Sequence, residues 1–179
     1  ANALSSQSIY PLSNFYLNLA KFLNEDFHSY DTLLAENFYK IENFKEAKKI
    51  YNSLNEKGEA YSWYSAKQLS RIYLQEENEE KAIKILSETY DNLVNKEIYE
   101  TFDYAEFLKN NEKFKESIKF YSEIISKVKN NHPLYAEATD GRGVAYERMG
   151  EWENAEKDLL SSLKACLLYT SPSPRDGDE

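Results

Sequence analysis

The residue types that carry most enzyme chemistry are scarce in this sequence. His28 and His132 are the only histidines, and Cys166 is the only cysteine. Each histidine falls at a predicted helix start or connecting turn, and no His, Cys, Asp and Glu residues have the spacing of a zinc site. Capping or solvent exposure therefore explains both histidines better than catalysis or metal binding. A single cysteine also excludes an internal disulfide.

Three other patterns could indicate a catalytic, phosphate-binding or cation-binding site, but a structural explanation suits each of them better. Asp140 and Glu147 lie seven residues apart, near one face of a helix, as paired carboxylates would, but solvated helix charges account for them as well. The segment 141–143, GRG, follows no predicted strand, which argues against a phosphate-binding loop. The acidic run 76–80 suits a helix start, where the helix dipole favours it. We therefore predict no enzyme activity, no cofactor and no metal.

The composition narrows the class of protein. The 179 residues carry a net charge of −9, and no stretch gathers the Lys and Arg residues that a phosphate backbone requires. We therefore expect no nucleic-acid partner. No apolar run approaches the ~20 residues of a membrane-spanning helix. Only 5 Gly and 4 Pro are present, which favours helices over tight β turns.

The elements are organised by a repeated pair of small residues, twelve positions apart. The pairs are Ala1/Ser13, Ala35/Ala47, Ser70/Ala82, Ala105/Ser117 and Gly143/Ala155. Their second members (13, 47, 82, 117 and 155) are separated by 34, 35, 35 and 38 residues. Large residues keep the same register, four positions after each second member. Two antiparallel helices approach closely where both contact residues are small, and large residues then fill the neighbouring groove, so the units must stack.

This pattern resembles the tetratricopeptide repeat, a two-helix unit of 34 residues. The last copy matches best, with Gly143, Tyr146, Gly150, Trp152 and Ala155 at the characteristic positions. Ser117 in place of Ala, Glu79 in place of the turn aromatic, and a turn glycine in the last copy alone are departures. The resemblance implies an all-α fold, a right-handed α-solenoid of helix–turn–helix repeats.

The segments 15–23 (FYLNLAKFL) and 141–159 (GRGVAYERMGEWENAEKDL) further resemble uncharacterised alphaproteobacterial tetratricopeptide proteins. That resemblance implies a longer repeat array without assigned chemistry. It favours the bacterial periplasm or envelope over the cytoplasm. The native N-terminus is expected to be missing, so that the chain is an internal fragment.

The register sets the expected domain and helix boundaries. We expect a truncated leading repeat over 1–27, with its second helix at 10–24, and repeats over 28–62, 63–97, 98–135 and 136–166. The helix pairs are expected at 28–41 and 44–56, 60–75 and 79–93, 97–110 and 114–130, and 134–149 and 152–165. The third repeat should hold an extra helical turn near 126–131. Residues 167–179 are expected to be a disordered tail, which resembles sequencing-adapter read-through.

The first helix of each tetratricopeptide unit lines the concave face of the superhelix, so the resemblance implies a groove. The residues expected there are Tyr39, Tyr64, Lys67, Arg71, Tyr99, Phe102, Lys109 and Arg148, with the acidic Glu106, Glu137, Asp140 and Glu147 on the same face. Aromatic rings and cations suit a bound peptide or partner segment. We predict a protein-interaction scaffold. The alternatives are a structural module that self-associates or links domains, and the non-catalytic repeat region of a larger enzyme.

Overall fold

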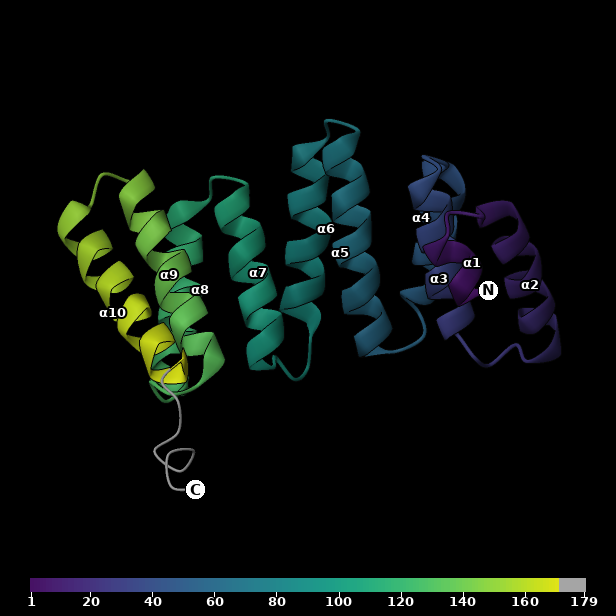
Figure 1. The fold of residues 1–179 in the computed structure, drawn as a ribbon. Helices are drawn as coiled ribbons and strands as arrows, with labels where there is room; N and C mark the ends of the chain where they lie inside the picture. The colour runs from purple at the N-terminus through teal and green to yellow at the C-terminus, as the bar shows by residue number, and fades with distance from the viewer. Residues whose placement is uncertain (171–179) are drawn as a thin grey trace, which may run out of the picture. The chain divides into compact units, whose positions relative to one another are not determined.

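The computed structural model describes residues 1–170, with side-chain surroundings through residue 167, and in this part of the chain it contains helices and no strand. The helix bounds are α1 Asn2–Ser6, α2 Tyr10–Leu23, α3 Ser29–Lys40, α4 Phe44–Leu54, α5 Glu59–Gln75, α6 Glu79–Asn92, α7 Ile98–Asn110, α8 Phe114–Lys127, α9 Pro133–Arg148 and α10 Trp152–Thr170. From α1 to α6, and again from α7 to α10, consecutive helices pack on one another and are joined by short connections (Figure 1). The predicted all-α fold of helix–turn–helix pairs is thereby confirmed.

The chain divides into two compact units, Ala1–Leu93 with α1 to α6, and Val94–Glu179 with α7 to α10. Inside each unit every helix packs on the next one in the sequence, and in the second unit α7 also contacts α9. No described helix is long and apolar enough to cross a membrane.

Small residues stand at the helix contacts, as the twelve-residue spacing predicts. Ala35, Ala47, Ala82 and Ala105 are fully buried. At Gly143 in α9, an added Cβ would lie 2.9 Å from Leu159 Cγ in α10. That approach is closer than real Cβ atoms make, so glycine sets how tightly α9 and α10 pack.

The extra residues of the third repeat lie elsewhere than the sequence predicts. The helix α8 ends at Lys127 and has 14 residues, the same length as α6. The additional turn is at the start of α9, which begins at Pro133, ten residues before Gly143. Proline is well suited to the first turn of a helix because it has no amide hydrogen to leave unpaired. The expected turn near 126–131 is therefore wrong in position.

The last helix extends beyond its expected end at residue 165. The helix α10 continues to Thr170, and Ala165 is buried within it. Cys166 and Leu167 continue α10 and are exposed. The rest of the expected tail, residues 171–179, lies outside the described residues.

Every turn between the two helices of a repeat has the same left-handed backbone. Ser8, Glu42, Glu77, Glu112 and Gly150 have φ of 62°, 60°, 58°, 60° and 76°. Each lies five residues before the second small residue of its repeat. The residue that follows donates its amide hydrogen to the carbonyl five positions earlier, at 2.8–2.9 Å, as Lys113 does to Leu108. This is the helix-ending bond of a Schellman motif, so the turn keeps its shape where glycine is missing.

These turns predict opposite effects for two substitutions. Gly150→Ala should lower the free energy of unfolding by about 1 kcal/mol, because a Cβ is strained at positive φ. Glu112→Gly should raise it by about 0.5–1 kcal/mol, since relief of that strain exceeds the added freedom of the unfolded chain. Urea denaturation of both variants measures the two signs. Equal signs would contradict a shared turn conformation.

Candidate interaction surface

The predicted groove residues of the first unit come mainly from one face of α5. Tyr64, Lys67, Arg71 and Gln75 are spaced by three or four residues and therefore share a helix face. Tyr64 and Lys67 are half-buried and Arg71 is exposed. We call Tyr39, Tyr64, Lys67 and Arg71 the α3–α5 surface, because Tyr39 is contributed by the preceding helix α3.

Arg71 and Tyr39 are in direct contact across the two helices. The guanidinium carbon of Arg71 lies 4.1 Å from the centre of the Tyr39 ring, a close cation–π stack. Arg71 Nη1 also donates a hydrogen bond to Gln68 Oε1 at 2.9 Å. Beside this stack, Tyr39, Lys40, Glu42, Phe44 and Gln75 line an open pocket of about 460 Å³. The guanidinium is thus held in place on an exposed surface.

Tyr64 is linked to a buried tyrosine of α4. The hydroxyls of Tyr51 and Tyr64 are hydrogen-bonded, and the ring centres lie 6.1 Å apart. Burial is the main reason that the pKa of both hydroxyls is raised, and the Glu36 carboxylate raises both further. The two hydroxyls are therefore coupled to each other and to Glu36.

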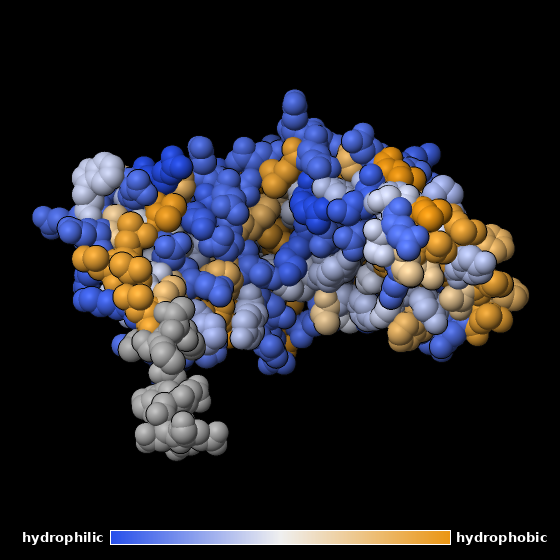
Figure 2. Space-filling model, viewed as in Figure 1, coloured by the Kyte–Doolittle hydropathy of each residue, from blue (hydrophilic) through white to orange (hydrophobic). Residues whose placement is uncertain are grey.

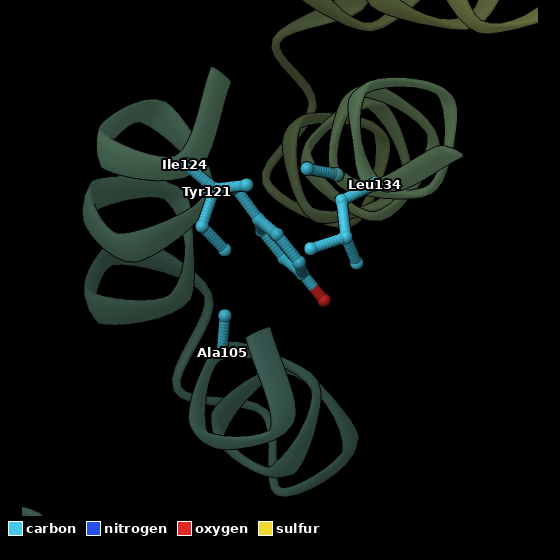
Figure 3. Packing of buried hydrophobic residues seen from close by; sticks show 5 residues of the cluster. Ala105, Tyr121, Ile124 and Leu134 are labelled. Atoms are coloured by element: carbon cyan, nitrogen blue, oxygen red, sulfur yellow. The ribbon is translucent and has the colours of Figure 1, made fainter. Parts of the chain in front are cut away.

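The second unit has a related arrangement around Tyr121 of α8. Its ring is packed among Ala105, Ile124 and Leu134, and its hydroxyl extends past them (Figure 3). That hydroxyl donates to Glu106, which also accepts from Lys109 Nζ at 2.6 Å. Burial, and then the hydrogen bond to Glu106, raise the pKa of Tyr121. Lys109 is therefore neutralised by a carboxylate of its own helix.

The other predicted residues of the second unit do not form one cluster. Phe102 packs against the buried core, with its ring 6.1 Å from that of Tyr121. Tyr99 is exposed beside His132, at 6.5 Å between ring centres. Lys109 and Arg148 meet at a pocket of about 480 Å³, lined by Lys109, Asn110, Glu112, Phe114, Val144 and Arg148. Phe102 is thus largely a core residue, and Tyr99 is not among the residues that line the Lys109 pocket.

The GRG segment has a structural explanation. Arg142 donates to both carboxylate oxygens of Asp158, at 2.6 and 2.8 Å, and to Ser122 Oγ at 2.9 Å. The two flanking glycines leave room for Leu159 and Tyr121. The bond to Asp158 raises the pKa of Arg142. Arg142, Asp158 and Ser122 therefore join α8, α9 and α10. The GRG segment forms no phosphate-binding loop.

Both histidines lie at helix N-caps. His132 Nδ1 accepts the amide hydrogen of Leu134 at 3.1 Å, and His28 is the N-cap of α3. Among the described residues no group of three or more His, Cys, Asp or Glu side chains is placed to hold a metal ion.

Sequence reasoning missed Glu36. It follows the small residue Ala35, as Glu106 follows Ala105, so both occupy one register position. Each is in the same repeat as a buried tyrosine, Tyr51 or Tyr121, whose hydroxyl it influences. The signal was present in the sequence: Glu and Tyr recur together, seventy residues apart, in the first and third full repeats.

Comparison with solved structures identifies the class of protein. No family model and no curated protein matches the chain. Solved structures resemble it over nearly its whole length at low sequence identity, among them the three that follow. What they share with this chain is an α-solenoid of helix–turn–helix repeats.

The repeat is the tetratricopeptide repeat, and the chain has that fold. YrrB, described as a TPR protein with an unusual peptide-binding site, has a TM-score of 0.60 at 18% identity, covering 92% of this chain and 81% of YrrB. MamA gives 0.63 at 14% identity, over 92% and 86% of the two chains. BtubC from P. vanneervenii gives 0.51 at 12%, over 99% and 97%.

Gly141 offers a test of how Tyr121 is positioned. A Cβ at residue 141 would lie 2.6–2.8 Å from the outer atoms of the Tyr121 ring. Gly141→Ala should therefore displace the ring and lower the free energy of unfolding by about 1–3 kcal/mol.

Replacing the tyrosine supplies the control. Leu86 and Leu159 occupy the corresponding positions of two other repeats. We therefore expect Tyr121→Leu to be compatible with the fold. In that background Gly141→Ala should cost much less, as measured by a double-mutant cycle in urea. An equal cost in both backgrounds would contradict the steric role assigned to Tyr121.

Proposed function

We propose that this chain is a protein-interaction scaffold that binds a peptide or extended partner segment on its first-helix faces. The observation that carries the proposal is the α3–α5 surface, where aromatic rings and a positioned guanidinium are accessible together. Tyrosine provides contact area with little loss of conformational entropy, and arginine forms charge-assisted hydrogen bonds. The described peptide-binding site of YrrB, which has the same fold, supports this reading.

The chemistry of the described residues favours binding over catalysis. Both histidines occupy helix N-cap positions, and the buried carboxylates Asp31 and Asp158 are bonded to Lys21 and Arg142. Glu106 is bonded to Lys109 and Tyr121. Carboxylates that are paired in this way stabilise helix packing. They are not left unpaired to act as a nucleophile or a general base.

Selection from a displayed library of random peptides tests the proposal directly. The full chain should enrich a set of sequences, and fluorescence anisotropy should then give their dissociation constants. Tyr64→Ala should weaken binding about tenfold or more, because an accessible aromatic anchor is lost.

Trp152→Ala is the matched control, since Trp152 is 67% exposed and is not part of the α3–α5 surface. It should leave the affinity unchanged. Thermal melting of each variant separates lost binding from lost folding. Failure to enrich any peptide, or equal losses in both variants, would count against the proposed surface.

A second candidate function, self-association, is supported by the apolar face of α2. Apolar side chains gather over this helix, at the right of the view in Figure 2. Phe22 is 78% exposed. The other exposed apolar residues of α2 are Leu12, Phe15, Tyr16, Leu19 and Leu23. Patches of this kind usually mark contact sites on soluble proteins. Packing of this face on a helix of a second copy would cover it.

Sedimentation velocity tests self-association. The wild-type chain should sediment as a concentration-dependent oligomer, and Phe22→Glu should shift it to monomer by placing a charge in the contact. Val94→Glu is the control, because Val94 is highly exposed and lies outside α2. A monomeric wild-type chain at all concentrations would exclude this candidate.

A further inference from the structure

Arg71 differs from Lys21 and Lys48, two other positioned cations of the first unit. Lys21 is paired with Asp31 and Lys48 with Glu76, at 2.5 and 2.7 Å. Among the described residues, no carboxylate lies within ion-pair distance of Arg71, although the chain has 31 acidic residues. The Tyr39 ring and Gln68 fix the guanidinium without neutralising it. A fixed and accessible charge of this kind is well prepared to bind an anion.

The residues around Arg71 also favour a bound anion. The half-buried Tyr64, whose ring lies 6.1 Å from that of Tyr51, is on the same face of α5. Arg71 lies near enough to lower the pKa of Tyr64. Lys67 is one turn before Arg71 on the same face of α5, with its ammonium 5.9 Å from the Trp63 ring. The surface thus presents the Arg71 guanidinium and the Tyr64 hydroxyl beside the Tyr39 ring.

One nearby group opposes an incoming anion. The half-buried Glu36 carboxylate raises the pKa of Tyr64, whereas Arg71 lowers it, so both charges face this hydroxyl. Glu36 is too far from Arg71 to form an ion pair with it. The opposing charge limits the negative charge that the surface tolerates. It favours a group with one negative charge over a phosphate with nearly two.

We propose that the α3–α5 surface recognises an acidic segment of a partner protein, with one aspartate or glutamate side chain as its anchor. The planar guanidinium of Arg71 binds the carboxylate through paired N–H donors, a geometry that arginine and carboxylate share. The Tyr64 hydroxyl donates to the same group, and Tyr39 shields it from water. This inference rests on the proposed peptide-binding function and names the chemistry of its partner.

The test uses the full chain and peptides enriched from the displayed library. Each enriched sequence is synthesised with blocked ends, with its acidic residue and with the matching amide, Glu→Gln or Asp→Asn. Anisotropy titrations at low and at 0.5 M salt compare the two. The acidic peptide should bind about ten- to a hundredfold more tightly at low salt, the range of a charge-assisted hydrogen bond, and the difference should shrink at high salt.

Substitutions in the protein then place the anchor. Arg71→Gln should remove the preference for the acidic peptide and leave binding of the amide peptide nearly unchanged. Arg71→Lys should restore only part of it, because lysine lacks the paired donors. Glu36→Gln should tighten binding of the acidic peptide several-fold by removing the opposing charge. Tyr64→Phe should weaken it modestly while keeping the ring.

The outcomes separate this inference from the broader proposal. Enriched peptides without an acidic preference, or acidic peptides whose preference survives Arg71→Gln, would overturn the inference and leave peptide binding intact. Preference for a free C-terminal carboxylate or a phosphorylated peptide would also overturn it. Complete absence of enrichment would overturn both.

Discussion

The close contact between small residues of paired helices is the constraint on which the fold depends. Ala35 and Ala47, and likewise the other pairs, allow two helices to approach until their neighbours interlock. The residue four positions after the second small residue then points across the contact towards the next helix. Because that position is fixed by the contact, its side chain decides which polar group of a neighbouring helix it can bond. Leu86 is buried and apolar, whereas the equally buried Tyr51 and Tyr121 place a hydroxyl beside Tyr64 and Glu106.

The two tyrosines show how one register position produces two surfaces. Tyr121 passes over Gly141 and bonds Glu106. The position equivalent to Gly141 in the first unit is Gln68, whose Cβ would occupy the same space, and there Tyr51 bonds Tyr64 instead. In the second unit the carboxylate is occupied by Tyr121 and Lys109. In the first, Glu36 stays outside ion-pair distance of Arg71. Small differences beside the contact thus decide which charges remain accessible.

The repeat could be predicted from the sequence because its signal is a spacing, and spacing follows directly from helix geometry. The extra turn of the third repeat could not be placed in this way. The small residues Ser117 and Gly143 fix only the number of residues between them. That number is equally compatible with a longer α8 and with a longer α9. Pro133 resolves the ambiguity physically, since it begins a helix readily and cannot continue one.

The sequence predicts which helix faces line the groove. It does not predict which residues of those faces form a binding site. Register places Arg71 and Lys109 on equivalent helices, yet it does not say which cation meets a carboxylate within its own helix. Glu106 is three residues before Lys109 and pairs with it. The residue three before Arg71 is Gln68, which accepts a hydrogen bond without cancelling the charge. The residue three positions before the cation is therefore a glutamate in α7 and a glutamine in α5. This difference is why we assign the proposed recognition chemistry to the first unit.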